Sequence, residues 1–239
     1  MSARRLIVNA DDFGLSPGVN AGVIRGAEEG IVTSASLMVR QPAARAAAAY
    51  ARRHPRLGLG LHVDLGEWAL DGSQWRPVYE VVALEWADGV AREVDAQLEA
   101  FRELTGRNPT HVDSHQHVHR REPVRGILTA LAVTLGVPLR HFSAVRYCGE
   151  FYGQDADGVP HLEWLTPARL IELVTSVSPG ATELCCHPAT TADVATMYRM
   201  ERPVEIDALC DPAVRAALVA SGVTLCSFEE LQPGSDERV

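Results

Sequence analysis

The chain has 239 residues, 46% of them hydrophobic and 22% charged, proportions typical of a globular protein with one sizeable core. Its 22 basic and 31 acidic residues give a formal net charge of −9, and the sequence contains no basic stripe or arm. We therefore do not expect nucleic acid or an anionic membrane surface as a partner. No stretch approaches the roughly 20 apolar residues of a membrane span.

The cysteines and the first residues indicate the compartment. Five cysteines are present, an odd number, and none has the paired CxxC spacing of a zinc or redox site. The first apolar run, 6–8, is too short for the hydrophobic region of a signal peptide. We therefore expect unpaired thiols and a cytoplasmic location.

Apolar runs alternate with helical patterns along the chain. Strands are expected over 5–10, 33–39, 57–65, 110–113, 139–142, 183–186 and 223–227. Helices are expected over 18–29, 42–53, 88–104, 123–135, 167–177 and 212–220. This alternation predicts an α/β fold with a single domain over 1–239. We expect its sheet to be a (β/α) barrel, distorted or with fewer than eight strands, and a doubly wound open sheet is the alternative.

Two segments, 66–86 and 147–164, interrupt the alternation and hold most of the aromatic residues. Long loops with many aromatic side chains are typical of lids or substrate walls, although plain packing is the other interpretation. We expect a wall or lid role for both segments, with Trp68 as a candidate for substrate contact.

Four polar clusters stand at the ends of predicted strands. They are Asn-Ala-Asp-Asp at 9–12, Leu-His-Val-Asp at 61–64, Asp-Ser-His-Gln-His-Val-His at 113–119 and Cys-His-Pro-Ala at 186–189. In a barrel these ends share one mouth. Adjacent carboxylates after a buried strand repel each other unless a cation is near, and carboxylate with imidazole is the ligand set of zinc and similar divalent ions. The sequence therefore predicts a divalent metal site at the mouth.

Three histidines in the third cluster are spaced two residues apart, at His115, His117 and His119. In an extended chain, residues two apart share a face, so we expect these three side chains to point the same way. A lone histidine is usually structural. Three on one strand, beside an Asp-Asp pair, are harder to explain without a metal.

The run Gly14-Leu15-Ser16-Pro17-Gly18 matches the G-x-S-x-G pattern of serine hydrolases. That motif uses the backbone N–H of the residue after the serine, and Pro17 has no N–H. We therefore interpret Ser16 as a helix N-cap with Pro17 at the first helical position.

These motifs resemble those of the YdjC family of carbohydrate deacetylases, which includes the chitooligosaccharide deacetylases. The matching motifs occur in the family's order and span residues 5 to about 190. They are VNADDFGLS at 8–16, GIVTS at 30–34, GLH at 60–62, THVDSHQHVH at 110–119 and HPA at 187–189, with a closing LCSF at 225–228.

The resemblance implies a (β/α) barrel-like fold and one divalent metal used to hydrolyse the acetamide of an N-acetylated sugar. Asp12, His62 and His115 would be the metal ligands. Asp11 would be the general base. His187 would be the general acid or a stabiliser of the transition state.

Other residues have less defined roles. His117 and His119 match family positions and, with Arg146, are candidates for substrate contact. The histidine ligands should donate their second ring nitrogen to an acceptor, for which Asp64 and Asp113 are the candidates.

Several alternatives stay open. A metal-dependent hydrolase of a phosphoester or another amide would share the ligand set, but a phosphate site should bring basic residues, and only Arg40 and Arg146 are near the clusters. A non-catalytic sugar-binding or metal-buffering protein is the third interpretation. Magnesium and zinc are the first candidates for the metal, with manganese, cobalt and nickel after them. A homodimer is a reasonable expectation.

Overall fold

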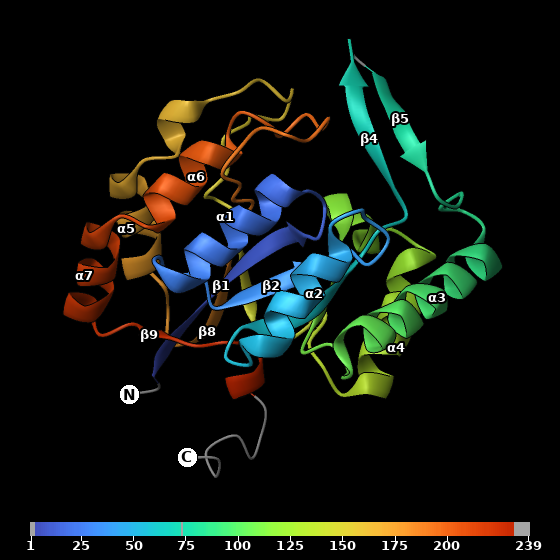
Figure 1. Cartoon of the computed structure of the whole chain (residues 1–239), viewed down its shortest axis with the longest axis horizontal. Helices are drawn as coiled ribbons and strands as arrows, with labels where there is room; N and C mark the ends of the chain where they lie inside the picture. The colour runs from blue at the N-terminus through green and yellow to red at the C-terminus, as the bar shows by residue number, and fades with distance from the viewer. Residues whose placement is uncertain (1–2, 73, 232–239) are drawn as a thin grey trace.

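The computed structural model describes residues 3–72 and 74–231 (Figure 1). The ends of the expected 1–239 domain, and Ser73 within the 66–86 segment, lie outside these residues. The strands are β1 (Arg4–Phe13), β2 (Ser34–Leu37), β3 (Gly58–Val63), β4 (Gly66–Asp71), β5 (Gln74–Glu80), β6 (Val112–Ser114), β7 (Arg146–Cys148), β8 (Gly180–Cys186) and β9 (Thr224–Leu225). The α-helices are α1 (Pro17–Glu28), α2 (Ala44–Arg53), α3 (Ala87–Thr105), α4 (Val124–Leu135), α5 (Pro167–Thr175), α6 (Arg202–Leu209) and α7 (Pro212–Ser221). Short 3-10 turns are η1 (His115–Arg120), η2 (Leu162–Trp164) and η3 (Glu229–Leu231).

Seven strands form one parallel sheet in the order β6-β3-β2-β1-β8-β7, with β9 paired to the start of β1. The sheet is curled into a half-barrel with helices around it, as Figure 1 shows. This confirms the predicted barrel-like α/β fold with fewer than eight strands. Because all the paired strands of this sheet run in the same direction, their carboxyl ends lie at one rim, where the polar clusters stand.

The expected strand at 139–142 is reduced to a single bridge between Leu139 and Val112 of β6. His141 has a φ of +66°, a left-handed conformation that ends the extended run after Arg140. The chain resumes pairing only at β7, which lies beside β8. The chain between Leu139 and Arg146 therefore connects the two edge strands of the sheet, β6 and β7.

The start of α1 is as the sequence predicts, and two glycines have clear structural reasons. Ser16 caps α1 by accepting a hydrogen bond from the Val19 N–H at 3.1 Å, and Pro17 follows at the first helical position. α4 ends at Gly136, whose φ of +67° is open to glycine without strain. Every residue of β3 is buried, including His62 at its carboxyl end. A Cβ on Gly60 would lie 2.4 Å from the His111 ring, so this strand position requires glycine.

Two elements depart from the expectations. The 66–86 segment, expected as a loop, contains the antiparallel hairpin β4–β5, which projects from the body in Figure 1. Helix α6 is not predicted, because its buried face carries Arg202 and Glu205 and the apolar periodicity is therefore missing.

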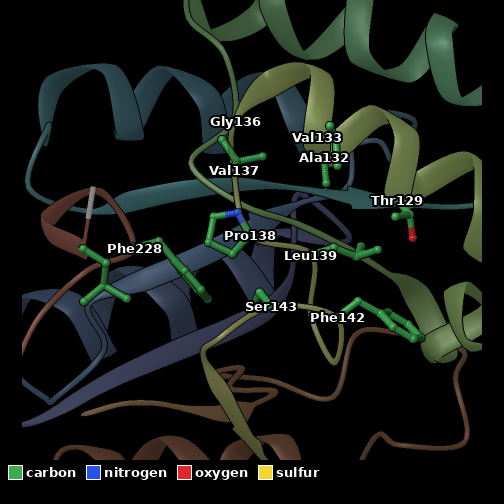
Figure 2. A pocket seen from close by; sticks show the side chains of 11 residues that line it. Thr129, Ala132, Val133, Gly136, Val137, Pro138, Leu139, Phe142, Ser143 and Phe228 are labelled. Carbon is green, nitrogen blue, oxygen red and sulfur yellow. The ribbon is translucent and has the colours of Figure 1, made fainter. Parts of the chain in front are cut away.

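A hollow of about 330 Å³ lies between α4, the 136–143 segment and Phe228 (Figure 2). It is lined by apolar side chains of α4 and of this segment, together with Phe228. It contains none of the strand-end polar residues. Across the described residues, no helix combines the length and the apolar character needed to cross a membrane.

Candidate metal and catalytic site

The predicted site residues of four strand ends line one cavity of about 380 Å³. Asp11 and Asp12 come from the end of β1, His62 from β3, His115 from the start of η1 after β6, and His187 from the residue after β8. The volume lies within the range of small-molecule sites. The structure thus brings together five residues that are up to 176 positions apart in the sequence.

The adjacent aspartates point to different partners because the backbone turns between them. Asp12 has a φ of +64°, and the register of β1 against β2 shifts between Ala10 and Phe13. Such a bulge redirects side chains at the end of a strand. Asp11 consequently contacts Arg140, whereas Asp12 contacts the two histidines and Arg202.

Asp12, His62 and His115 form a compact set of three donors. The Asp12 Oδ1 atom is 3.3 Å from His62 Nε2 and 3.0 Å from His115 Nδ1, and one donor atom of each residue lies within 4.8 Å of the others. Burial disfavours the charged His115 ring, but Asp12 and Glu67 together outweigh burial and raise the pKa of His115 to about 9. The same competition, with Asp113 and Asp11 as the main carboxylates, raises the pKa of His62 well above its usual value.

The arrangement of these three side chains suits a divalent cation. The ring nitrogens and the carboxylate oxygen converge at a buried point that the surrounding carboxylates make favourable for positive charge, and His115 Nε2 is buried without a hydrogen-bond partner. One carboxylate and two imidazoles are ligands shared by zinc and by the other first-row divalent ions.

One of the two expected acceptors supports a histidine of this set. His62 Nδ1 is 2.7 Å from Asp113 Oδ1, which leaves Nε2 facing Asp12. Asp64 does not contact either histidine. Its carboxylate instead accepts hydrogen bonds from Gln41 and from the Tyr79 hydroxyl.

Asp11 is held by a buried guanidinium that the sequence analysis missed. Arg140 donates to both Asp11 oxygens, at 2.6 and 2.7 Å, and also contacts Asp113 at 2.8 Å and Glu183 at 2.5 Å. Burial raises the pKa of Asp11, but Arg140 outweighs burial and lowers it to about 2. The Asp11 carboxylate is therefore ionised and fixed in orientation.

His187 faces Asp11 from the end of β8. Its Nε2 atom is 4.0 Å from Asp11 Oδ2, and its backbone N–H donates to Glu205 Oε2 at 2.5 Å. The ring lies beside Tyr152 and Tyr198. Burial lowers the pKa of His187 to about 4, so the ring is neutral near pH 7.

The three closely spaced histidines do not share a face, and the extended-chain expectation is wrong. Residues 115–120 form η1, and both Gln116 and His117 have positive φ values. His115 consequently points to Asp12, whereas His117 and His119 turn toward His141. His117 still lines the cavity, but His119 is fully buried behind it.

The remaining substrate candidates lie outside the cavity lining. The backbone of Trp68 exchanges two hydrogen bonds with the Gln116 side chain, and its ring lines an adjoining hollow. Arg146 donates to the carbonyls of Ser178 and Pro179, away from the cavity. From the two interrupting segments, the cavity receives Glu67, Trp75, Tyr147, Tyr152, Gln154 and Asp155 among others.

Arg202 is the second functional residue that sequence reasoning missed. Its Nη2 donates to Asp12 Oδ2 at 2.6 Å, and Nε donates to the Tyr198 carbonyl. Arg140 lies within the predicted strand at 139–142, where a charged residue in a short apolar run is a signal that could have flagged it. Arg202 had no such signal, because it lies on the helix that was not predicted.

The fold and the site together define a class of protein. It is a curled parallel-sheet α/β protein with an Asp-His-His set and a neighbouring aspartate at the carboxyl ends of its strands. The family described as YdjC-like protein matches residues 5–220, and this chain belongs to that family.

Known proteins of similar sequence carry related names. The chain is 36% identical to a carbohydrate deacetylase of Geobacillus stearothermophilus, over 95% of this chain and 98% of that protein. It is 33% identical to a chitooligosaccharide deacetylase of Serratia marcescens, with the same two coverages. A crystal structure from Enterococcus faecalis V583, described as a proposed cellobiose-phosphate cleavage protein, has a TM-score of 0.77 and 26% identity, covering 96% of this chain and 99% of that one.

Proposed function

We propose that this protein is a carbohydrate deacetylase, a metal-dependent hydrolase that removes the acetyl group from an N-acetylated sugar. The substrate class is a chitooligosaccharide or a related sugar that contains N-acetylglucosamine. The observation that carries the proposal is the meeting of Asp12, His62 and His115 with Asp11 and His187 in one cavity. The names of the two relatives at 36% and 33% identity support it.

Asp12, His62 and His115 would hold the divalent ion, which when bound would act as a Lewis acid and assist the activation of water. Asp11 is the general base, because its ionised carboxylate opens onto the same cavity and can accept the proton of the attacking water. Arg140 positions this carboxylate through two hydrogen bonds, at 2.6 and 2.7 Å.

His187 lies across the cavity from Asp11, with its Nε2 atom 4.0 Å from Asp11 Oδ2. A neutral imidazole can donate its N–H to the developing oxyanion or to the departing nitrogen. This favours the stabilising role in the resting protein. The acid role requires His187 to gain a proton during the reaction.

The cavity's charge favours a neutral sugar amide over a phosphoester. Of the described residues that line it, Arg202 is the one that carries a fixed positive charge, and its Nη2 is bonded to Asp12. Asp11, Asp12, Glu67 and Asp155 also line the cavity and would repel a phosphate. Arg40 is paired with Glu93 elsewhere on the surface.

The test is acetate release from a panel of N-acetylated mono- and oligosaccharides, run with several divalent metals. We expect release to need a metal and to fall by about 10²- to 10⁴-fold in Asp11→Asn, which still binds the metal. Asp207→Asn, at an exposed aspartate paired with Arg25, is the matched control and should keep full activity.

Three outcomes would contradict the proposal. Undiminished turnover in Asp11→Asn would remove Asp11 as the base. A metal-loaded chain that releases no acetate from any panel member, but releases phosphate from a sugar phosphate, would favour the phosphoester alternative. A sugar that binds without any release would favour the binding protein.

A further inference from the structure

Three histidines that the proposed mechanism does not use meet beside the catalytic cavity. His117 and His119 come from η1, and His141 comes from the segment that follows the bridge to β6. One ring nitrogen of each lies within 4.8 Å of the other two. We propose that these three residues form a second metal site, which takes a transition-metal ion such as zinc and is separate from Asp12, His62 and His115.

His119 provides the clearest sign of a missing partner. The residue is fully buried, and its Nε2 atom has no hydrogen-bond partner among the described residues. Its other ring nitrogen, Nδ1, is 2.6 Å from the Ser114 hydroxyl. When Nδ1 carries the proton and donates it to Ser114, the lone pair of Nε2 is free to bind a metal. A buried nitrogen left without a partner would otherwise be unfavourable.

His117 and His141 already have the spacing of two ligands on one ion. His117 Nδ1 is 3.0 Å from His141 Nε2. Two nitrogens bound tetrahedrally to one zinc at about 2.0–2.1 Å are about 3.3–3.4 Å apart, so a small adjustment suffices. The second nitrogen of His117, Nε2, is 3.3 Å from the Tyr147 hydroxyl, which can accept its proton and fix the ring.

The backbone of two of the three residues is held in an uncommon conformation. His117 has a φ of +53° and His141 a φ of +66°, both in the left-handed region that non-glycine residues rarely occupy. Such conformations are unfavourable and tend to occur where function requires a side chain in a particular place. Here they turn both rings toward His119.

A plain cluster of hydrogen-bonded rings is the competing interpretation. It explains the 3.0 Å contact between His117 and His141 as one N–H···N bond. It leaves His119 Nε2 without a partner. The metal site accounts for both observations, and it predicts a selectivity that a ring cluster lacks.

That selectivity follows from the donor set. Three imidazoles and no carboxylate favour zinc, cobalt, nickel or copper, and they offer little to magnesium, which prefers oxygen ligands. The site also adjoins the catalytic cavity, because His117 and the Tyr147 that contacts it both line that cavity. A bound ion would therefore tie η1 to the 139–148 segment and stiffen one wall of the cavity.

The experiment uses the full chain stripped of metal and titrated with Zn²⁺, Co²⁺ or Mg²⁺. Bound metal is counted by elemental analysis, and the Co²⁺ form is followed by its visible spectrum. We expect about two equivalents of Zn²⁺ in the wild type and about one in Asp12→Asn or in His141→Asn. Asparagine is chosen at both positions because it tolerates a positive φ. The double variant should bind none, and Mg²⁺ should not fill the second site.

Two further variants keep the outcome decisive. His54→Gln removes a half-exposed histidine outside both clusters and should leave the count at that of the wild type. His117→Asn replaces a second ligand if His141→Asn fails to fold. The proposal is overturned if Asp12→Asn, shown to be folded, binds no Zn²⁺, or if folded His141→Asn and His117→Asn both hold as much Zn²⁺ as the wild type. These readouts do not depend on deacetylase activity, so the two proposals can fail separately.

Discussion

The floor and the wall of the cavity are built in different ways. The floor consists of buried ionisable residues at strand ends, tied together by Arg140 and Arg202. The wall comes from the β4–β5 hairpin and the 147–164 segment, where Trp75 is 58% and Tyr152 36% exposed. Charges that are buried and multiply bonded are sensitive to the loss of one partner, whereas exposed aromatic side chains contribute area alone. Substitutions should therefore be costly in the floor and mild in the wall.

The largest effect is expected at Arg140. Arg140→Met would leave Asp11, Asp113 and Glu183 buried without their shared cation, so we expect a loss of about 3–5 kcal/mol in the free energy of unfolding. Urea denaturation measures this loss. The control is Arg40→Met, which breaks a partly exposed pair with Glu93 and should change stability by less than about 1 kcal/mol. Equal losses in the two variants would show that the buried ion pairs of the floor are no more sensitive than a partly exposed surface pair.

The next effect concerns His111, which lies beneath the floor and contacts the Ser36 hydroxyl at 3.1 Å. Burial lowers its pKa from 6.5 to about 4. The unfolded chain therefore takes up this proton more readily, and stability present above pH 6.5 is lost as the pH falls toward 4. The loss is up to about 3 kcal/mol.

Denaturation at a series of pH values tests this prediction. The fall in stability below about pH 6.5 should be shallower in His111→Gln than in the wild type. His54→Gln, at a half-exposed histidine, should follow the wild type. A wild-type slope in His111→Gln would mean that other groups carry the acid sensitivity.

A smaller effect separates two aspartates that the sequence treats alike. Asp113 contacts His62 Nδ1 at 2.7 Å, whereas Asp64 contacts Tyr79 and Gln41. Asp113→Asn should weaken metal affinity by about 10- to 100-fold, because the proposed ligand His62 loses its charged acceptor. Asp64→Asn should leave affinity unchanged. Isothermal titration of the stripped chain gives both values, and equal losses would place the support for His62 elsewhere.

The smallest effect is expected in the wall. Trp75 is 58% exposed and lines the cavity, so Trp75→Ala should raise KM by about 3- to 10-fold and leave kcat nearly constant. Trp86→Ala removes an equally exposed tryptophan, 55% accessible, that does not line the cavity. Steady-state deacetylation kinetics compare the two. A fall in kcat for Trp75→Ala would give the wall a part in the chemistry.

The sequence predicts what depends on neighbours along the chain. The alternation of strands and helices, the cap at Ser16 and the grouping of polar strand ends all follow from local patterns, and the structure contains them. Strand ends meet at one rim of any parallel half-barrel, so Asp11, His62 and His187 converge without further information.

What the sequence does not predict depends on contacts between distant residues or on single backbone angles. The positive φ values at Gln116 and His117 separate His115 from the other two histidines, although the spacing suggests a shared face. Arg202 reaches Asp12 across 190 positions, from a helix whose buried charges hide its periodicity. Strand β5 of the hairpin is almost entirely exposed, so its pattern lacks the apolar alternation of a half-buried strand.

The half-barrel leaves two edges where backbone N–H and C=O groups could pair with another chain. Both edge strands, β6 and β7, are only three residues long, and Leu139 already occupies the outer side of β6 by a bridge. In the projecting hairpin, Pro77 removes one donor from β5. Short edges and an edge proline are devices by which proteins avoid intermolecular strand pairing. The fold therefore keeps an open sheet, with its polar rim free for chemistry, at little risk of aggregation through β-sheet extension.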